Sequence, residues 1–168
     1  MGFPSGMVTL LFTDIEGGIG LWEADREAMT EASARHDRIV REQIEAAGGR
    51  VVKTVGEACR TVFADPSAAL ASAVAIQRVA RTEPWPPGLP VRVRMVLHSG
   101  TCLERDGDYV GPVVNRAAQL LAVGHGGQVL VSGTTYELLA GCLPGGIGLR
   151  DLGEHRLKDL GRAERVSR

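Results

Sequence analysis

The sequence has no excess of basic residues and no long apolar run, and each absence excludes a class of protein. Its 19 Lys and Arg residues are balanced by 20 Asp and Glu residues, which leaves a net charge of -1 at pH 7. Proteins that bind nucleic acids or anionic membranes by general electrostatic attraction need a basic excess, so neither partner is expected. No apolar run approaches the ~18 residues of a membrane span, and Met1–Met7 lacks the features of a signal peptide. The sequence therefore predicts a soluble, cytoplasmic protein.

Cysteines and aromatic residues are also scarce. Cys59, Cys102 and Cys142 form no CxxC pair, so neither a disulfide framework nor a zinc site is expected. Aromatic residues make up 4% of the chain, and Trp22 and Trp85 are too few and too far apart for a base-stacking platform. No Ser-His-Asp or Cys-His arrangement of a nucleophilic enzyme stands out.

The apolar residues follow strand and helix patterns along the chain, which predicts one folded domain over residues 1–168. The sequence is 44% hydrophobic, enough to bury a core. Strands are expected at 8–13, 50–55, 60–64, 91–97 and 128–132, helices at 26–47, 66–80, 111–122 and 134–140, and a final hairpin at 149–160. The first six elements follow the order β-α-β-β-α-β. This order is typical of a ferredoxin-like α+β fold, with two helices on one face of an antiparallel sheet.

Two acidic residues stand where strands end. Asp14 follows the first strand, and Glu57 lies in the turn of the hairpin formed by the next two strands. Because the first strand lies beside the second hairpin strand in such a sheet, both carboxylates are expected at one sheet edge. Together with the backbone carbonyl of Ile15, they could hold Mg²⁺. Taken singly, Asp14 also fits a helix cap and Glu57 a solvated turn residue.

Four further polar residues surround the predicted third helix and the hairpin. Asn115 and Gln119 are four residues apart and therefore share one helix face. Asp108 lies just ahead of that helix, and Lys53 lies on the strand that leads into the Glu57 turn. By spacing alone, the simpler interpretation is that Lys53 and Asp108 are surface charges and that the two amides are ordinary polar residues of a helix.

Two histidines are expected to have structural roles. His36 lies on the apolar stripe of its helix and is interpreted as a core or interface residue. His98 lies at the end of a strand and is given a packing role.

Six segments, in order and at compatible spacing, identify a known family. They are LFTDIEGG (11–18), GGRVVKTVGE (48–57), VRVRMVLHSG (91–100), GDYVGPVVNRAAQL (107–120), GGQVLVS (126–132) and LRDLGEHRLKDL (149–160). From about residue 8 to 166 the chain resembles the class III adenylate/guanylate cyclase catalytic domain, in its bacterial form. The resemblance implies the nucleotidyl cyclase fold, which has a ferredoxin-like βαββαβ core. It also implies a homodimer with two sites at the interface, each built from both chains.

The resemblance gives the acidic residues a role in binding metal ions. Asp14, the carbonyl of Ile15 and Glu57 would hold two Mg²⁺ ions, or Mn²⁺ in some members. The reaction would be attack of the ATP 3′-hydroxyl on the α-phosphorus, with release of pyrophosphate and formation of cyclic AMP. One ion would lower the pKa of the 3′-hydroxyl, and the other would neutralise the triphosphate.

The remaining polar residues would read the nucleotide. By resemblance, Lys53 and Asp108 would bind the base from the other chain, Asn115 would orient the ribose, and Gln119 would face the α-phosphate. Adenine offers an acceptor at N1 and a donor at N6, which a lysine and a carboxylate complement. Guanine presents the reverse pattern, so this pair favours ATP.

Several positions depart from the family pattern. Glu57 and Ala58 replace the usual Asp-Gly, Arg60 stands where an apolar strand residue is usual, Gln119 replaces Arg, and Gly18 replaces a common Ser. Loss of one preorganised donor lowers a rate by roughly 10²–10³, and loss of a phosphate-directed arginine by up to ~10³–10⁵. The sequence therefore predicts an adenylate cyclase of weak activity. The alternative is a catalytically silent nucleotide-binding or dimerisation module that regulates a larger protein. A diguanylate cyclase is set aside because the hairpin turn has no GGDEF-type sequence.

Overall fold

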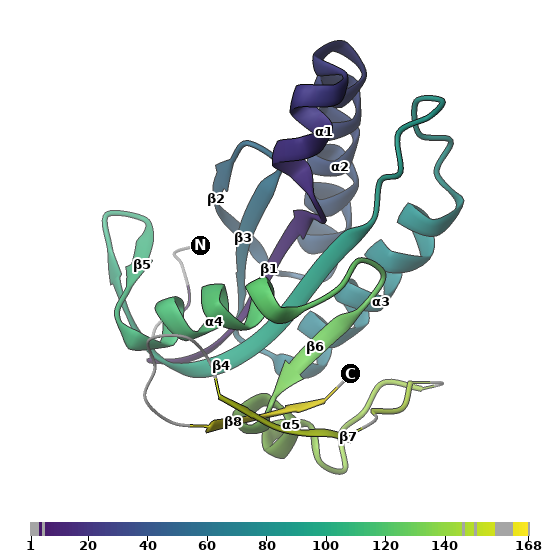
Figure 1. Cartoon of the computed structure of the whole chain (residues 1–168). Coiled ribbons are helices and arrows are strands. Elements are labelled where there is room, and N and C mark those ends of the chain that lie inside the picture. Colours follow the sequence, from purple (N-terminus) through teal and green to yellow (C-terminus); the bar gives the residue numbers. More distant parts are fainter. Residues whose placement is uncertain (1–3, 5, 146, 150, 157–162, 168) are drawn as a thin grey trace.

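Among the described residues, eight strands form one sheet with helices on both faces (Figure 1). The structure is a computed structural model that describes residues 4, 6–145, 147–149, 151–156 and 163–167, the last two ranges by their backbone alone. The strands are β1 (Gly6–Ile15), β2 (Arg50–Val55), β3 (Ala58–Phe63), β4 (Val93–Arg105), β5 (Asp108–Val110), β6 (Val129–Ser132), β7 (Asp151–Arg156) and β8 (Ala163–Ser167). Their order is β2-β3-β1-β4-β6-β8-β7, and β5 pairs with β4 outside this row.

The helices connect the strands and begin at residues that favour helix starts. They are α1 (Gly18–Ala24), α2 (Arg26–Ala46), α3 (Pro66–Thr82), α4 (Pro112–Val123) and α5 (Gly133–Leu139). The caps of α2 and α3 are aspartates: Asp25 Oδ1 accepts from the N–H of Ala28 at 3.0 Å, and Asp65 Oδ1 from that of Ser67 at 2.9 Å. No described helix has the length and apolar character needed to cross a lipid bilayer.

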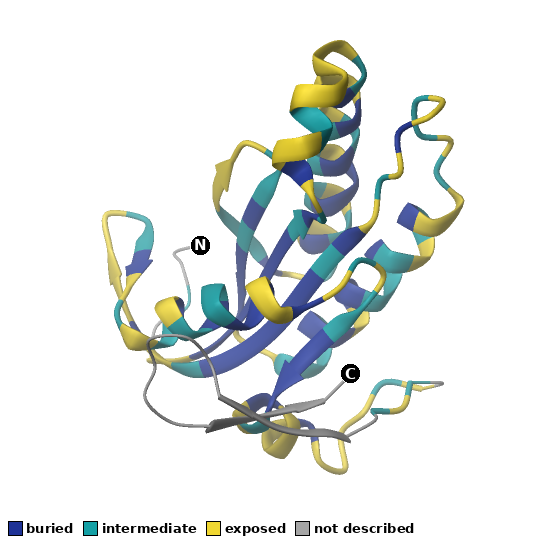
Figure 2. Cartoon of the chain, in the orientation of Figure 1, coloured by how far each residue is buried: buried dark blue, intermediate teal, exposed yellow. Residues whose placement is uncertain are grey.

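The sheet is covered on both faces. On one face, α2 and α3 pack against apolar residues of β1, β3, β4 and β6. On the opposite face, α4 packs against a second apolar cluster from β1, β3, β4 and β6. Figure 2 shows buried residues along the central strands and the inner sides of the helices. The predicted α+β fold, with two helices on one face of the sheet, is therefore confirmed, and α4 adds a layer on the other face.

The register of the central strands brings three distant segments to one end of the sheet. β1 lies between β3 and β4 and is antiparallel to both, with Thr13 opposite Cys59 and Asp14 opposite Arg94. The end of β1, the β2–β3 turn and the start of β4 therefore meet. β4 pairs with β6 in parallel, as Met95 opposite Val129 shows.

Some boundaries differ from those expected. No helix was expected at residues 18–24, but Gly17 (φ 66) makes one left-handed turn, after which α1 begins. β4 runs to Arg105 because its last three residues pair with β5, a strand that was not predicted. In the predicted 149–160 hairpin, β7 is present, but it pairs with β8, which begins only at residue 163. Residues 157–160 of that hairpin lie outside the described residues.

Candidate active site

Asp14, at the end of β1, is bound by an arginine from the neighbouring strand. Arg94 Nε donates to Asp14 Oδ1 at 2.7 Å, and Arg94 Nη2 donates to Oδ2 at 2.5 Å. The hydrogen bond with Asp14 is the main reason why the pKa of Arg94 is raised, and the charges of Asp14, Glu16 and Glu57 add to this effect. The guanidinium is therefore a permanent cation among three carboxylates.

Glu57 lies in the β2–β3 turn and points back over the start of α1. Its Oε2 accepts a hydrogen bond from Trp22 Nε1 at 3.2 Å. Its Oε1 lies so close to Gly18 that a Cβ added to Gly18 would be 2.2 Å away. The glycine that replaces the family's usual serine therefore makes room for the longer glutamate. Sequence reasoning had treated these two departures as separate.

The structure brings Asp14 and Glu57 to the same end of the sheet, as the topology predicts. The side chain of Ile15 is buried in the core, so Ile15 can offer only its backbone carbonyl. Two carboxylates and one carbonyl are hard oxygen donors, which fit Mg²⁺ or Mn²⁺ by their chemistry. Arg94 hydrogen-bonds to both oxygens of Asp14, so its positive charge disfavours a second cation at this carboxylate. The described residues contain no cluster of three His, Cys, Asp or Glu side chains placed to hold a metal ion.

Lys53 of β2 and Asp108 of β5 lie together within one chain, although 55 positions separate them in the sequence. Lys53 Nζ is 3.9 Å from Asp108 Oδ2, and both side chains are about half exposed. Asp108 Oδ1 also accepts the backbone N–H of Tyr109 at 2.8 Å, which orients the carboxylate. A hydrogen-bond donor and an acceptor thus stand side by side at the surface.

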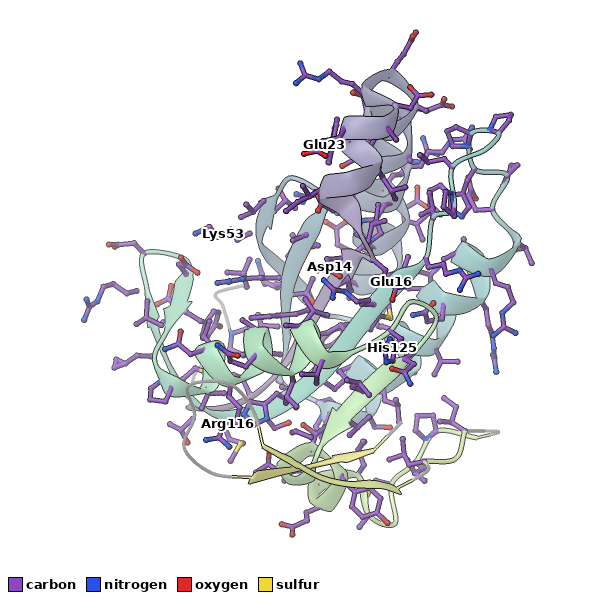
Figure 3. The ribbon with its side chains drawn as sticks, viewed as in Figure 1. Asp14, Glu16, Glu23, Lys53, Arg116 and His125 are labelled. Carbon is purple, nitrogen blue, oxygen red and sulfur yellow. The ribbon has the colours of Figure 1, made fainter. Side chains whose placement is uncertain are left out.

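This pair lies away from the acidic end of β1. In Figure 3, Lys53 projects outward from β2, whereas Asp14 lies near the middle of the sheet. Within a single chain, the two groups therefore lie at different places on the sheet.

Asn115 and Gln119 lie on α4 and share one side of that helix. The opposite side is buried against the sheet through Val114, Ala117 and Leu120. Asn115 is exposed and Gln119 is half-buried. Neither amide hydrogen-bonds to the described part of the chain, so both are available to a ligand. Their assigned roles at the ribose and the α-phosphate stay predictions.

Sequence reasoning missed several residues around the acidic end. Arg94 is the most important, and its strand gave a signal, because a charged residue in a central strand requires a partner. Glu16 also belongs there, with its Oε1 3.8 Å from His125 Nδ1. Figure 3 shows Glu16 and His125 beside the loop that leads into β6.

The predicted structural roles of His36 and His98 are consistent with their burial. His36 is 2% exposed and its Nε2 lies 3.4 Å from Thr13 Oγ1. Burial lowers the pKa of His36 to about 4, against the weaker opposing effects of Asp37 and Glu57. His98 is 4% exposed, and its Nδ1 lies 2.7 Å from Ser132 Oγ.

Curated relatives include proteins with and without an assigned activity. Over 165 residues the chain is 40% identical to an uncharacterized protein of Mycobacterium tuberculosis, covering 97% of this chain and 55% of that protein. Over 188 residues it is 33% identical to an adenylate cyclase of Neurospora crassa, covering 97% of this chain and 8% of that enzyme. The chain thus spans about half the length of the mycobacterial relative.

Solved structures show the same fold. The chain superposes on an adenylate cyclase of Trypanosoma brucei, solved in its monomeric state, with a TM-score of 0.82 and 27% identity, covering 99% of this chain and 90% of that chain. It superposes on the adenylyl cyclase CyaB of P. aeruginosa with a TM-score of 0.85 and 24% identity, covering 99% and 95%. The sequence also matches the adenylate and guanylate cyclase catalytic domain over residues 3–166. On this match and this fold, the chain belongs to the class III adenylate and guanylate cyclase catalytic domain family.

Proposed function

We propose that this domain is an adenylate cyclase of low turnover, which converts ATP to cyclic AMP and pyrophosphate at sites shared by two copies of the chain. The contact between Lys53 and Asp108 carries the proposal. A lysine can donate to adenine N1, and a carboxylate can accept from the N6 amino group. Guanine presents the reverse pattern, so the lysine would face a donor and the carboxylate would face an acceptor. ATP is therefore the preferred substrate.

The acidic end of a second copy would supply the other half of each site. Asp14, the Ile15 carbonyl and Glu57 would hold Mg²⁺ or Mn²⁺, which supplies Lewis-acid stabilisation of the 3′-oxygen and the triphosphate when bound. Asn115 would orient the ribose through its amide. Gln119 would offer the α-phosphate a neutral hydrogen bond.

Two features support the low turnover. Gln119 cannot supply the positive charge of the family's usual arginine, a loss of roughly 10³–10⁵ in rate where such a group is essential. In addition, Arg94 hydrogen-bonds to both oxygens of Asp14, and its positive charge disfavours a metal ion at the same carboxylate.

The second candidate is a silent nucleotide-binding or dimerisation module. The observation that favours it is that both acidic side chains are already engaged, Asp14 by Arg94 and Glu57 by Trp22. In that case Lys53 and Asp108 would still read a purine, but no reaction would follow.

Two measurements on the same preparation separate these candidates. Cyclic AMP formation is followed with ATP and Mn²⁺, with GTP as the control substrate, and ATP binding is measured by calorimetry. The enzyme predicts slow cyclic AMP formation that depends on protein and metal. Binding without turnover supports the silent nucleotide-binding module. The absence of both binding and turnover contradicts the enzyme and the nucleotide-binding module.

A further inference from the structure

A hollow beside Asp108 lies on the sheet face covered by α4, between β1, β2, β3 and β5. Phe12 forms part of its wall, and Arg60 forms another part. The free space is only about 10 Å³, whereas pockets for small molecules measure about 300–1,000 Å³. It is room for about one water molecule and not for a purine.

Arg60 lines the hollow together with Phe12 and Asp108. Lys53 of β2 pairs with Arg60 of β3, and Arg60 pairs with Phe12 of β1, so the three residues form one row across the sheet. Paired residues project from the same face, which places their side chains next to one another. Arg60 Cζ lies 5.0 Å from the centroid of the Phe12 ring, which is a cation–π contact.

We propose that Arg60 closes the purine subsite and thereby determines the affinity of the domain for nucleotide. Its guanidinium covers the ring face of Phe12, and it must swing away before a purine can lie beside Lys53 and Asp108. This inference rests on the proposed function, because it takes Lys53 and Asp108 as the groups that read the base.

The forces that hold Arg60 in place are weak enough to be overcome by a ligand. Its guanidinium forms no ion pair or hydrogen bond with the described residues, so the ring of Phe12 is its contact. A cation–π contact of this kind changes the equilibrium constant between the bound and the displaced side chain by a factor of about 2 to 30. The positive charge of Lys53 on the paired position also favours displacement toward solvent. Arg60 therefore lowers nucleotide affinity without abolishing it.

The test compares Arg60→Leu and Arg60→Lys with the unmodified protein. Leucine removes the cation and leaves an apolar wall, whereas lysine keeps a flexible cation near Phe12 and is the matched control. Calorimetry measures the Kd of ATP and of inorganic tripolyphosphate, a probe with no base. We expect Arg60→Leu to bind ATP about 2 to 30 times more tightly, with tripolyphosphate unchanged in both variants.

Each other result overturns a defined part of the argument. Weaker ATP binding by Arg60→Leu with unchanged tripolyphosphate binding would show that a base stacks on the guanidinium, and the proposal would be wrong. An equal change for both ligands would assign Arg60 to the phosphates, which also contradicts it. If neither the unmodified protein nor the variants bind ATP, the proposed function itself fails. Melting temperatures verify folding, and Arg60→Met replaces the leucine variant if that protein is unstable.

Discussion

Arg94 decides whether the carboxylate of Asp14 is free. Both oxygens of Asp14 accept hydrogen bonds from the guanidinium, and both side chains are largely shielded from water. In such surroundings a charge is screened less than at the surface, so the pair opposes the entry of a second cation.

Arg94→Met is therefore expected to raise the affinity of the nucleotide-free protein for Mn²⁺ by about tenfold or more, because one nearby positive charge is lost. Manganese binding by electron paramagnetic resonance measures this directly. Arg92→Met is the matched control, since it removes the same charge two residues earlier on an exposed position. Equal affinities in the Arg94 and Arg92 variants would contradict this account of Asp14.

The two altered site residues are expected to limit the rate together. Gln119→Arg restores a cation toward the α-phosphate, and Glu57→Asp restores the usual carboxylate length. The double variant should increase cyclic AMP turnover by orders of magnitude, roughly 10³-fold or more, in an assay with Mn²⁺. Each single variant is the control, and an unchanged rate in the double variant would show that the defect lies elsewhere.

His36 should make stability depend on pH. Its pKa in the folded protein is about 4, below the ~6.5 of an unfolded histidine. The folded state therefore favours the neutral ring, and its stabilising effect is complete above pH 6.5 and lost as the pH falls toward 4. We expect the free energy of unfolding in urea to decrease by about 2 kcal/mol from pH 8 to pH 5 on account of His36. His36→Gln should remove this component, and His125→Gln, at an exposed position, should keep it.

At the scale of elements, α3 is tied to the sheet by one amide. Gln77 Nε2 donates to the carbonyl of Val93 at 2.8 Å and to that of Gln128 at 3.1 Å. These carbonyls stand at the start of β4 and just before β6, the parallel pair. A single side chain thus fixes the helix relative to both strands.

Gln77→Leu should lower the free energy of unfolding by about 1–3 kcal/mol, because both carbonyls lose this donor. Denaturant unfolding measures the change. Gln43→Leu on α2 serves as the control, since the Gln43 side chain has no hydrogen bond within the described residues and should cost under about 0.5 kcal/mol. Similar losses in the two variants would mean that the two hydrogen bonds of Gln77 do not contribute to the free energy of unfolding.

At the scale of the whole molecule, the proposed function places each site between two copies of the chain, with Lys53 from one copy and Asp14 from the other. Met7, Ile19, Val55, Leu103, Val110 and Val123 are large apolar residues left exposed on the single chain. Single exposed apolar residues are common on monomeric proteins, so they do not by themselves indicate an interface. The homodimer is part of the proposed function because the resemblance to the cyclase family implies it.

Mixing two inactive variants tests this arrangement. Asp14→Asn removes the metal ligand, and Lys53→Glu reverses a base-reading charge, so each homodimer should be inactive. In an equal mixture, half of the dimers carry one intact site, and activity should return to about a quarter of the unmodified level. Asp14→Asn mixed with Glu57→Gln is the control, because both changes fall on the same half-site. Failure of the first mixture to regain activity, in dimers verified by sedimentation, would contradict the shared site.

Much of the architecture could be predicted from the sequence because strands and helices depend on local patterns. A continuous apolar run located β1, and Asp65-Pro66 marked the start of α3. Asp14 and Glu57 were noted because they stand where predicted strands end, and the resemblance to the cyclase family selected Lys53 and Asp108. The short helix α1 was missed because a pair of glycines can end a helix or stand at the start of one. The tertiary contacts around the pair determine which of the two occurs.

The linear order of residues was sufficient to identify the family, to predict the order of the core elements and to choose candidate side chains. Each of these depends on patterns and motifs that are read along the chain. The tertiary structure alone decided what those side chains touch. Arg94 is 80 positions from Asp14, Trp22 is 35 positions from Glu57, and Arg60 meets Phe12 only because two strands pair in one register. Such contacts depend on packing across the sheet. They determine whether a side chain that matches a motif is free to bind a ligand or already has a partner within the chain.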